Sequence, residues 1–178
     1  MRPDPEALAW MMRASEADKA EFVAAMSKQE RNAWRWVWRV WARDSQLPPE
    51  ESWRTWLILA GRGFGKTRAG AEWVRAVAER DPAARIALVA ANLGEARAIM
   101  VEGESGLRRI GTPGQRPAFE SSLRRLTWSN GAQAMLYSAA EPEALRGPQH
   151  SHARRTGPEG GIRQRSSLAA RWAGTLRH

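Results

Sequence analysis

The residues whose chemistry is clearest lie at positions 60 to 67, where the sequence reads AGRGFGKT. The run before them, TWLILA, has the length and apolar character of a buried strand, and the run after them, TRAGAEWVRAVAE, has helix-forming composition. A strand, a glycine-rich loop and a helix in this order are typical of a phosphate-binding P-loop. Gly61, Gly63 and Gly65 allow the backbone to curl so that its amide groups point at phosphate oxygens.

The last two residues of this segment add what backbone amides cannot supply. Lys66 is expected to place a positive charge on the β- and γ-phosphates, and the hydroxyl of Thr67 is expected to hold Mg²⁺. The helix that follows directs the positive end of its dipole at the same site. The strict pattern has glycine at position 60, and Ala60 is compatible with it if that residue keeps a negative φ. We predict an ATP site with Mg²⁺; the alternative is a glycine-rich turn that binds nothing.

The elements around this loop predict an α/β fold, a truncated P-loop NTPase parallel sheet preceded by a helical N-terminal segment. Ser15 and Ser27 are spaced like N-caps of successive helices, after a first helix over residues 5–13. A single helix is expected after Ser27, with arginines at every fourth residue beside a stripe of tryptophans. We interpret the tryptophans as core packing; a base-stacking or phosphate-tracking surface is the alternative.

Further elements are expected beyond the loop. A second buried strand begins at Arg85, a helix covers about 93–101, and a glycine- and proline-rich loop follows over 103–117. Two strand-like runs flank Ser129-Asn130-Gly131 and predict a β-hairpin, and one helical turn is expected over 141–145.

Composition excludes several classes of protein. The chain has 178 residues, enough for about one domain, and its lack of cysteine excludes a disulfide scaffold, a thiolate zinc site and a cysteine nucleophile. Asp4 and Glu6 precede any apolar run, which argues against a secretory signal, and arginines interrupt every apolar stretch, which argues against a membrane span. We therefore expect a cytoplasmic protein. Of the net charge of +9, residues 154–178 supply +5, from six arginines and one glutamate.

The loop AGRGFGKTRAGAEWVR, with an arginine inside it, resembles that of phage terminase large subunits, the ATPases that package DNA. The resemblance continues through ARDSQLPP (42–49), GESGL (103–107) and LTWSNGAQAMLYSAAEPEALRGPQHSHA (126–153), so that it covers roughly residues 28–153. It is closest to the terminases of prophages and gene transfer agents. The resemblance implies that Arg62 senses or triggers hydrolysis, that Gln46 contacts adenine, and that Arg146-Gly147 is the short motif before the second acidic strand.

The same resemblance implies the partners and the full set of ligand-binding residues. The partners are double-stranded DNA, the phage portal and the small terminase subunit, with no membrane, a possible oligomer in the full-length family, and a bacterial cytoplasm as the location. The nucleotide-binding residues that it implies are Gly61, Arg62, Gly63, Phe64, Gly65, Lys66, Thr67 and Gln46.

The chain departs from the family after Ala153. There the family continues with Asp-Glu, whose aspartate orders Mg²⁺ and whose glutamate polarises the attacking water. Here Arg154 and Arg155 follow, the only later acid is Glu159, and residues 82–178 contain no aspartate, which excludes a nuclease site in this part. We therefore expect an ATP-binding N-terminal fragment of a terminase large subunit that is deficient in hydrolysis, so whether it acts as an enzyme stays open. The alternatives are a nucleotide- or DNA-binding module that does not hydrolyse, and another P-loop NTPase.

These expectations divide the chain into a helical segment (1–50), a partial ATPase domain (51–153) and a basic tail (154–178). The tail is expected to be disordered and to arise from a frameshift near codon 154; a natural basic DNA-binding arm is the alternative. His150 and His152 are interpreted as loop or strand-end residues because no third metal ligand is in sight. Glu72 is interpreted as a solvated helix position and not as a catalytic base.

Overall fold

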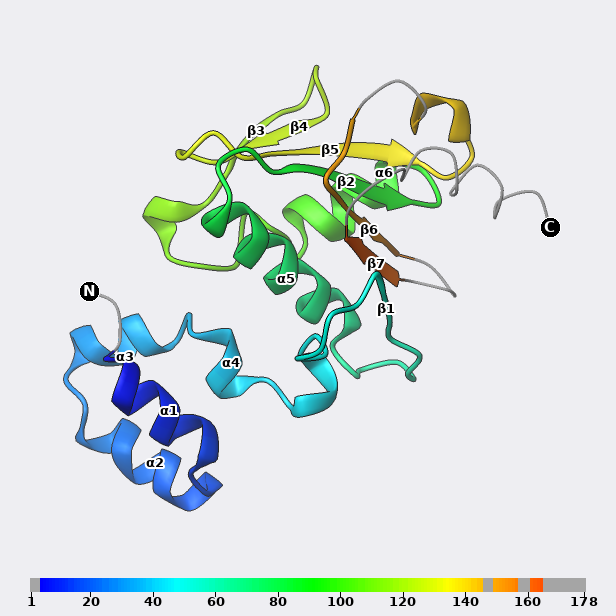
Figure 1. Ribbon diagram of the computed structural model, residues 1–178. Helices are drawn as coiled ribbons and strands as arrows, with labels where there is room; N and C mark the ends of the chain where they lie inside the picture. Colours follow the sequence, from blue (N-terminus) through cyan, green and yellow to red (C-terminus); the bar gives the residue numbers. More distant parts are fainter. Residues whose placement is uncertain (1–3, 146–148, 157–160, 165–178) are drawn as a thin grey trace. The chain divides into compact units, whose positions relative to one another are not determined.

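The chain divides into two compact units, which are described separately below. The computed structural model describes residues 4–145, 149–156 and 161–164, and the division falls between Leu47 and Pro48. The first unit is helical and the second is a mixed α/β unit built on one sheet (Figure 1).

Short capped helices make up the first unit. They are α1 (Pro5–Arg13), α2 (Glu16–Ala25), α3 (Lys28–Trp34), α4 (Trp38–Trp41) and the 3-10 turn η1 (Asp44–Gln46). The predicted N-caps are confirmed: Ser15 and Ser27 each form a reciprocal capping box with the acidic residue three positions later. Four buried residues form the core of this unit: Met11 of α1, Met26 directly after α2, Trp34 of α3 and Val40 of α4.

The single helix expected after Ser27 is wrong, because the chain leaves the helical conformation between α3 and α4. At Val37 ψ is 84°, and its N–H donates to the carbonyl of Trp34 at 3.0 Å, which closes a tighter turn than an α-helix has. Tryptophan and valine lose side-chain freedom in a helix. A run rich in both therefore has a low helix propensity, which tertiary packing can override. The stripe of arginines is therefore interrupted. The packing interpretation of the tryptophans is correct for the buried Trp34 and wrong for Trp41, which is 45% exposed.

One seven-stranded sheet organises the second unit, in the order β1-β7-β6-β2-β5-β4-β3. Its central strand β2 is parallel to β5 and β6, and the other pairs are antiparallel. The expected parallel sheet is therefore correct only around β2. The strands are β1 (Thr55–Leu57), β2 (Arg85–Ala90), β3 (Ala118–Glu120), β4 (Arg125–Thr127), β5 (Gln133–Ser138), β6 (His152–Arg155) and β7 (Gly161–Gln164).

Helix α5 (Lys66–Arg80) joins β1 to β2 and packs its buried side on the sheet (Figure 1). The predicted helix after position 93 is also present, as α6 (Leu93–Glu95) continued by the π-helix η2 (Ala96–Glu102), and η2 contacts both α5 and β2. The other face of the sheet carries a small cluster that includes Val89, Tyr137 and Leu145. The remaining turns are η3 (Pro113–Gln115) and η4 (Pro142–Leu145).

The predicted hairpin is confirmed as β4 and β5. Its strands are antiparallel, and Gly131 in the connecting turn has a φ of 99°, a conformation that favours glycine. The Nδ2 of Asn130 donates to the carbonyl of Ala78 at 2.8 Å and so ties the turn to the end of α5.

The strand before the glycine-rich loop is shorter and more exposed than expected. Of the three residues of β1 only Trp56 is buried, and Leu57 and Leu59 are 50% and 71% exposed. Strand β1 lies at the edge of the sheet, where β7 is its one neighbour among the described strands. An edge strand presents fewer residues to the core, so the expectation of a fully buried strand is wrong.

The expectation that residues 154–178 are disordered as a whole is also wrong. Arg154 and Arg155 belong to β6, and residues 161–164 form β7. Strand β2 has backbone groups on both sides, and buried backbone groups need hydrogen-bond partners, which β6 supplies on the side opposite β5. Ala153 and Ile162 bring apolar side chains into the core. Positions 157–160 and 165–178, and with them Glu159, lie outside the described residues.

Candidate phosphate-binding site

The glycine-rich loop connects β1 to α5 and has the backbone that its sequence predicts. Gly63 and Gly65 adopt φ values of 78° and 90°, and Gly65 is the N-cap of α5 in the left-handed conformation. Arg124 is the one non-glycine residue with positive φ in the described part of the chain, so Ala60 keeps a negative φ. The substitution of alanine for glycine at position 60 is therefore compatible with this loop.

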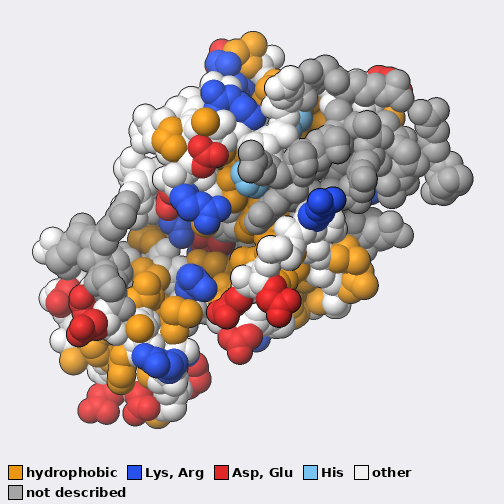
Figure 2. Space-filling view, viewed as in Figure 1, with side chains coloured by type: hydrophobic (Ala, Val, Ile, Leu, Met, Phe, Trp, Pro, Cys, Tyr) orange, Lys and Arg blue, Asp and Glu red, His pale blue; other side chains and the backbone are white. Residues whose placement is uncertain are grey.

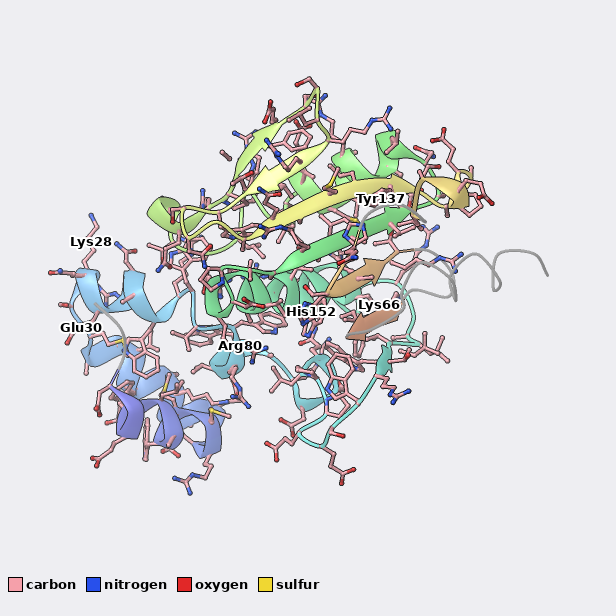
Figure 3. The ribbon with its side chains drawn as sticks, turned by 45° about the horizontal axis from the view of Figure 1, so that its top comes forward. Lys28, Glu30, Lys66, Arg80, Tyr137 and His152 are labelled. Atoms are coloured by element: carbon pink, nitrogen blue, oxygen red, sulfur yellow. The ribbon has the colours of Figure 1, made fainter. Side chains whose placement is uncertain are left out.

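Lys66, the first residue of α5, folds back across the loop. Its Nζ donates to the carbonyl oxygens of Ala60 at 2.5 Å and of Gly61 at 2.8 Å. Figure 3 shows the lysine at the start of the helix. These two bonds hold the ammonium group at the mouth of the loop, where the positive end of the α5 dipole also lies. An anion that binds at this place would contact an ammonium group whose position is already fixed.

The other predicted loop residues differ in their surroundings. Arg62 is exposed in the turn, while Phe64 is half-buried. Thr67 is half-buried in the first turn of α5, and its carbonyl oxygen accepts a hydrogen bond from a distant residue, Arg154. Gln46 belongs to the first unit, so its expected contact with adenine stays a prediction. There it is buried, and its side-chain oxygen accepts from the backbone N–H of Arg43 at 3.0 Å.

Arg154 is the residue of this region that the sequence reasoning missed. It stands in β6 opposite Leu88 of β2 and is only 2% exposed. Its Nη2 donates to the carbonyl of Thr67 at 2.9 Å, and its Nε lies where a side chain at Gly70 would stand, 2.5 Å from the position of a Cβ. Its Nη1 is buried and has no hydrogen-bond partner in the described part of the chain. Burial lowers the pKa of Arg154 to about 10, so the guanidinium still carries its charge at neutral pH.

The donor set around the loop does not fit Mg²⁺. Strands β2, β5 and β6, which are parallel and end at the same edge, contain no acidic residue, and the hydroxyl of Thr67 is the one oxygen donor predicted there. No group of three or more histidine and acidic side chains able to hold a metal occurs among the described residues. Mg²⁺ prefers carboxylate oxygens, and here a buried guanidinium lies against Thr67 instead. The expectation of a metal at Thr67 therefore lacks support from its surroundings.

Glu72 is buried and paired, which corrects its interpretation as a solvated position. It is 2% exposed; one carboxylate oxygen accepts from Nε of Arg68 at 2.8 Å, and the other accepts from Nε of Arg75 at 2.7 Å. Both oxygens of the Glu72 carboxylate are therefore engaged by guanidinium groups of the same helix.

The two histidines of β6 and its approach have separate partners. His150 lies 3.0 Å from the hydroxyl of Tyr137, and His152 packs edge-on against Trp73 and lies 2.9 Å from the hydroxyl of Ser151. Burial lowers the pKa of His150. His152 is the first residue of β6 and His150 precedes the strand, as the interpretation of loop or strand-end residues held. The motif Arg146-Gly147 lies outside the described residues.

These features define a mixed α/β unit with a glycine-rich, cationic loop at the start of its longest helix. The chain belongs to the family of terminase large subunits of the T4-like virus type, N-terminal part, whose model matches residues 57–153 and thus more than half of the chain. The match begins in β1 and ends in β6, one residue before Arg154. No curated protein and no solved structure matches the chain. Among the helices of the described residues, none is long and apolar enough to cross a bilayer.

Proposed function

We propose that this chain binds ATP through the glycine-rich loop, as the N-terminal part of a phage DNA-packaging ATPase, and that it does not hydrolyse ATP appreciably. The observation that carries the proposal is Lys66, whose ammonium group is fixed on the carbonyl oxygens of residues 60 and 61 at the N-terminus of a 15-residue helix. A cation and a helix N-terminus over a glycine-rich loop form a ready site for phosphate. Membership of the terminase family also supports the proposal, because it indicates that the loop comes from a packaging motor.

The proposed fold is the corresponding part of a P-loop NTPase sheet. The order β1, loop, α5 and β2, with β6 and β5 parallel to β2, supports it. Within this proposal Arg62, which is exposed in the loop, acts on a bound nucleotide or on a neighbouring subunit, and Gln46 contacts the base. Double-stranded DNA, the portal and the small terminase subunit are the proposed partners, in the cytoplasm of a bacterium that carries a prophage or gene transfer agent.

Hydrolysis is proposed to be deficient because it needs a carboxylate that orients the attacking water. The ends of β2, β5 and β6 offer none within the strands, and the buried Glu72 is neutralised by Arg68 and Arg75. General-base catalysis contributes about 10²–10⁴-fold, so its loss alone leaves little turnover.

The alternative, a nucleotide- or DNA-binding module that does not hydrolyse ATP, would bind DNA through positive charge. On the face drawn in Figure 2, the Lys and Arg side chains of the described residues are interspersed with acidic and apolar ones, without a single basic patch. A module that binds DNA through its phosphates needs such a concentration of positive charge. Binding to DNA that survives Lys66→Ala and decreases steeply with salt would favour this alternative.

Calorimetry with ATP on the full chain tests the proposal. Lys66→Ala should weaken binding at least tenfold, because charge-assisted contacts with phosphate are worth about 1.5–3 kcal/mol. Lys28→Ala, which removes an exposed lysine of the helical unit, is the matched control and should bind as the wild type does. Phosphate release should stay near background in all three proteins. Wild-type affinity in Lys66→Ala would refute the site, and turnover near 1 s⁻¹ that depends on Lys66 would refute the deficiency in hydrolysis.

A further inference from the structure

Two buried polar atoms that have no hydrogen-bond partner among the described residues lie on one side of β6 and its extension. They are Nη1 of Arg154 and Oγ1 of Thr156. Residues two apart in an extended chain point to the same face, and Arg154 shows which face this is, since its guanidinium touches Thr67 and the space beside Gly70. Both unpaired groups therefore point to the side of the sheet that α5 covers.

The direction of the strands places these groups near the loop. Strand β6 is parallel to β2, and α5 must run back against both in order to connect β1 to β2. Moving along β6 from Arg154 to Thr156 therefore leads toward the N-terminus of α5 and the glycine-rich loop. Arg154 lies beside the first turn of α5, and Thr156, two residues further along the chain, lies nearer to the loop.

Among the residues that the structure describes, the charge at this place is positive and has no acidic partner. Arg154 and Lys66 both bond to backbone carbonyl oxygens, and no ion pair joins either of them to a described acidic side chain. The nearest acid along α5, Glu72, is already engaged by two other arginines. A buried cation that lacks an anionic partner is costly, and buried polar atoms without partners are rare in folded proteins. A bound anion would supply the missing charge.

We propose that Arg154 is the fixed counter-charge of the loop site, so that the chain binds the oligophosphate of a nucleotide without a divalent metal. This inference rests on the proposed function and adds that the nucleotide is bound without a metal ion. Lys66 and the loop amides hold the phosphates at the mouth, and Arg154 neutralises them from beneath the first turn of α5. Its Nη2 also fixes the carbonyl of Thr67, which holds that turn in place. A second cation at this position opposes Mg²⁺ and makes the metal unnecessary.

The test is calorimetry of the full chain with ATP and with inorganic tripolyphosphate, once in EDTA and once in excess Mg²⁺. Wild-type protein should bind both ligands in EDTA at least as tightly as with Mg²⁺. Arg154→Met should weaken metal-free binding roughly ten- to hundred-fold, the range for hydrogen bonds to charged groups. It should melt at the same or a higher temperature, because a cation without an anionic partner is replaced by an apolar side chain of similar length. Arg155→Met changes the next arginine, on the opposite face of β6, and should bind as the wild type does.

A second pair of variants makes the test independent of how well Arg154→Met folds. Arg154→Lys keeps the charge and should retain most metal-free binding, whereas Arg154→Gln is polar but neutral and should lose it. Binding in EDTA that is unchanged by Arg154→Met and Arg154→Gln would overturn the inference. So would wild-type affinity that rises tenfold or more on adding Mg²⁺. If Lys66→Ala abolishes binding with Mg²⁺ in that case, the proposed function stands without this inference; absence of binding under every condition overturns both.

Discussion

The packing of Arg154 against Gly70 predicts an unusual response to a single methyl group. In most helices, replacing an interior glycine by alanine stabilises the protein by about 1 kcal/mol, because alanine loses less backbone freedom on folding. Here the new Cβ would lie 2.5 Å from Nε, 3.0 Å from Cζ and 3.2 Å from Cδ of the buried Arg154. Overpacking of this kind costs about 1–3 kcal/mol. We expect the costs to outweigh the gain, so that Gly70→Ala destabilises the second unit by about 1 kcal/mol, the difference of these two terms.

A double-mutant cycle isolates the contact. In an Arg154→Ala background the clash is gone, and Gly70→Ala should then stabilise by about 1 kcal/mol. The two residues should therefore show a coupling energy of about 2 kcal/mol, well above the few tenths expected for independent sites. Urea unfolding is monitored by the hydrogen exchange of peptides from α5 and β2, so that the measurement reports on the second unit alone. A Gly70→Ala change that stabilises both backgrounds equally would show that Arg154 does not lie under α5.

Two further predictions concern a cap and a titrating group. Ser27→Ala should cost about 1 kcal/mol and reduce the exchange protection of α3, since it removes one half of a capping box; Ser45→Ala, at an exposed serine, is the control. Because burial lowers the pKa of His150, the unfolded chain takes up that proton at a higher pH than the folded chain does. The stability that His150 contributes is complete above the ordinary pKa of histidine. It is lost as the pH falls through the lower pKa that His150 has in the folded chain. His150→Gln should therefore reduce the decrease in unfolding free energy between about pH 8 and pH 5, measured by urea titration; an unchanged decrease would refute this origin.

Local sequence signals predicted the parts of the fold that depend on local geometry. Glycine at positions 63 and 65 with Lys66 predicted the loop, and serine with an acid three residues later predicted the starts of α2 and α3. The turn at Gly131 predicted the β4–β5 hairpin. In each case the residues that make the hydrogen bonds or adopt the special φ are close together in sequence, so the pattern contains the physical cause.

Features that depend on distant partners were not predicted. The helix expected after Ser27 contains good i to i+4 spacing, yet burial of Trp34 and Val40 in one core breaks it at Val37. Strand β1 was expected to be buried because its residues are apolar, but its place at the sheet edge leaves Leu57 half-exposed. The position of a strand within a sheet is decided by its neighbours, and composition does not record it.

Arg154 was missed for a related reason, and one residue of α5 could have indicated it. Arginine is almost never fully buried without an ionic partner, so a segment beginning Arg154-Arg155 is not read as a central strand. Gly70 lies in the middle of a helix whose other residues are good helix formers, at a cost of about 1 kcal/mol relative to alanine. Such a glycine indicates a close approach by another part of the chain, and here the space it leaves is taken by the guanidinium. The glycine three residues after Thr67 and the arginine in β6 therefore depend on each other.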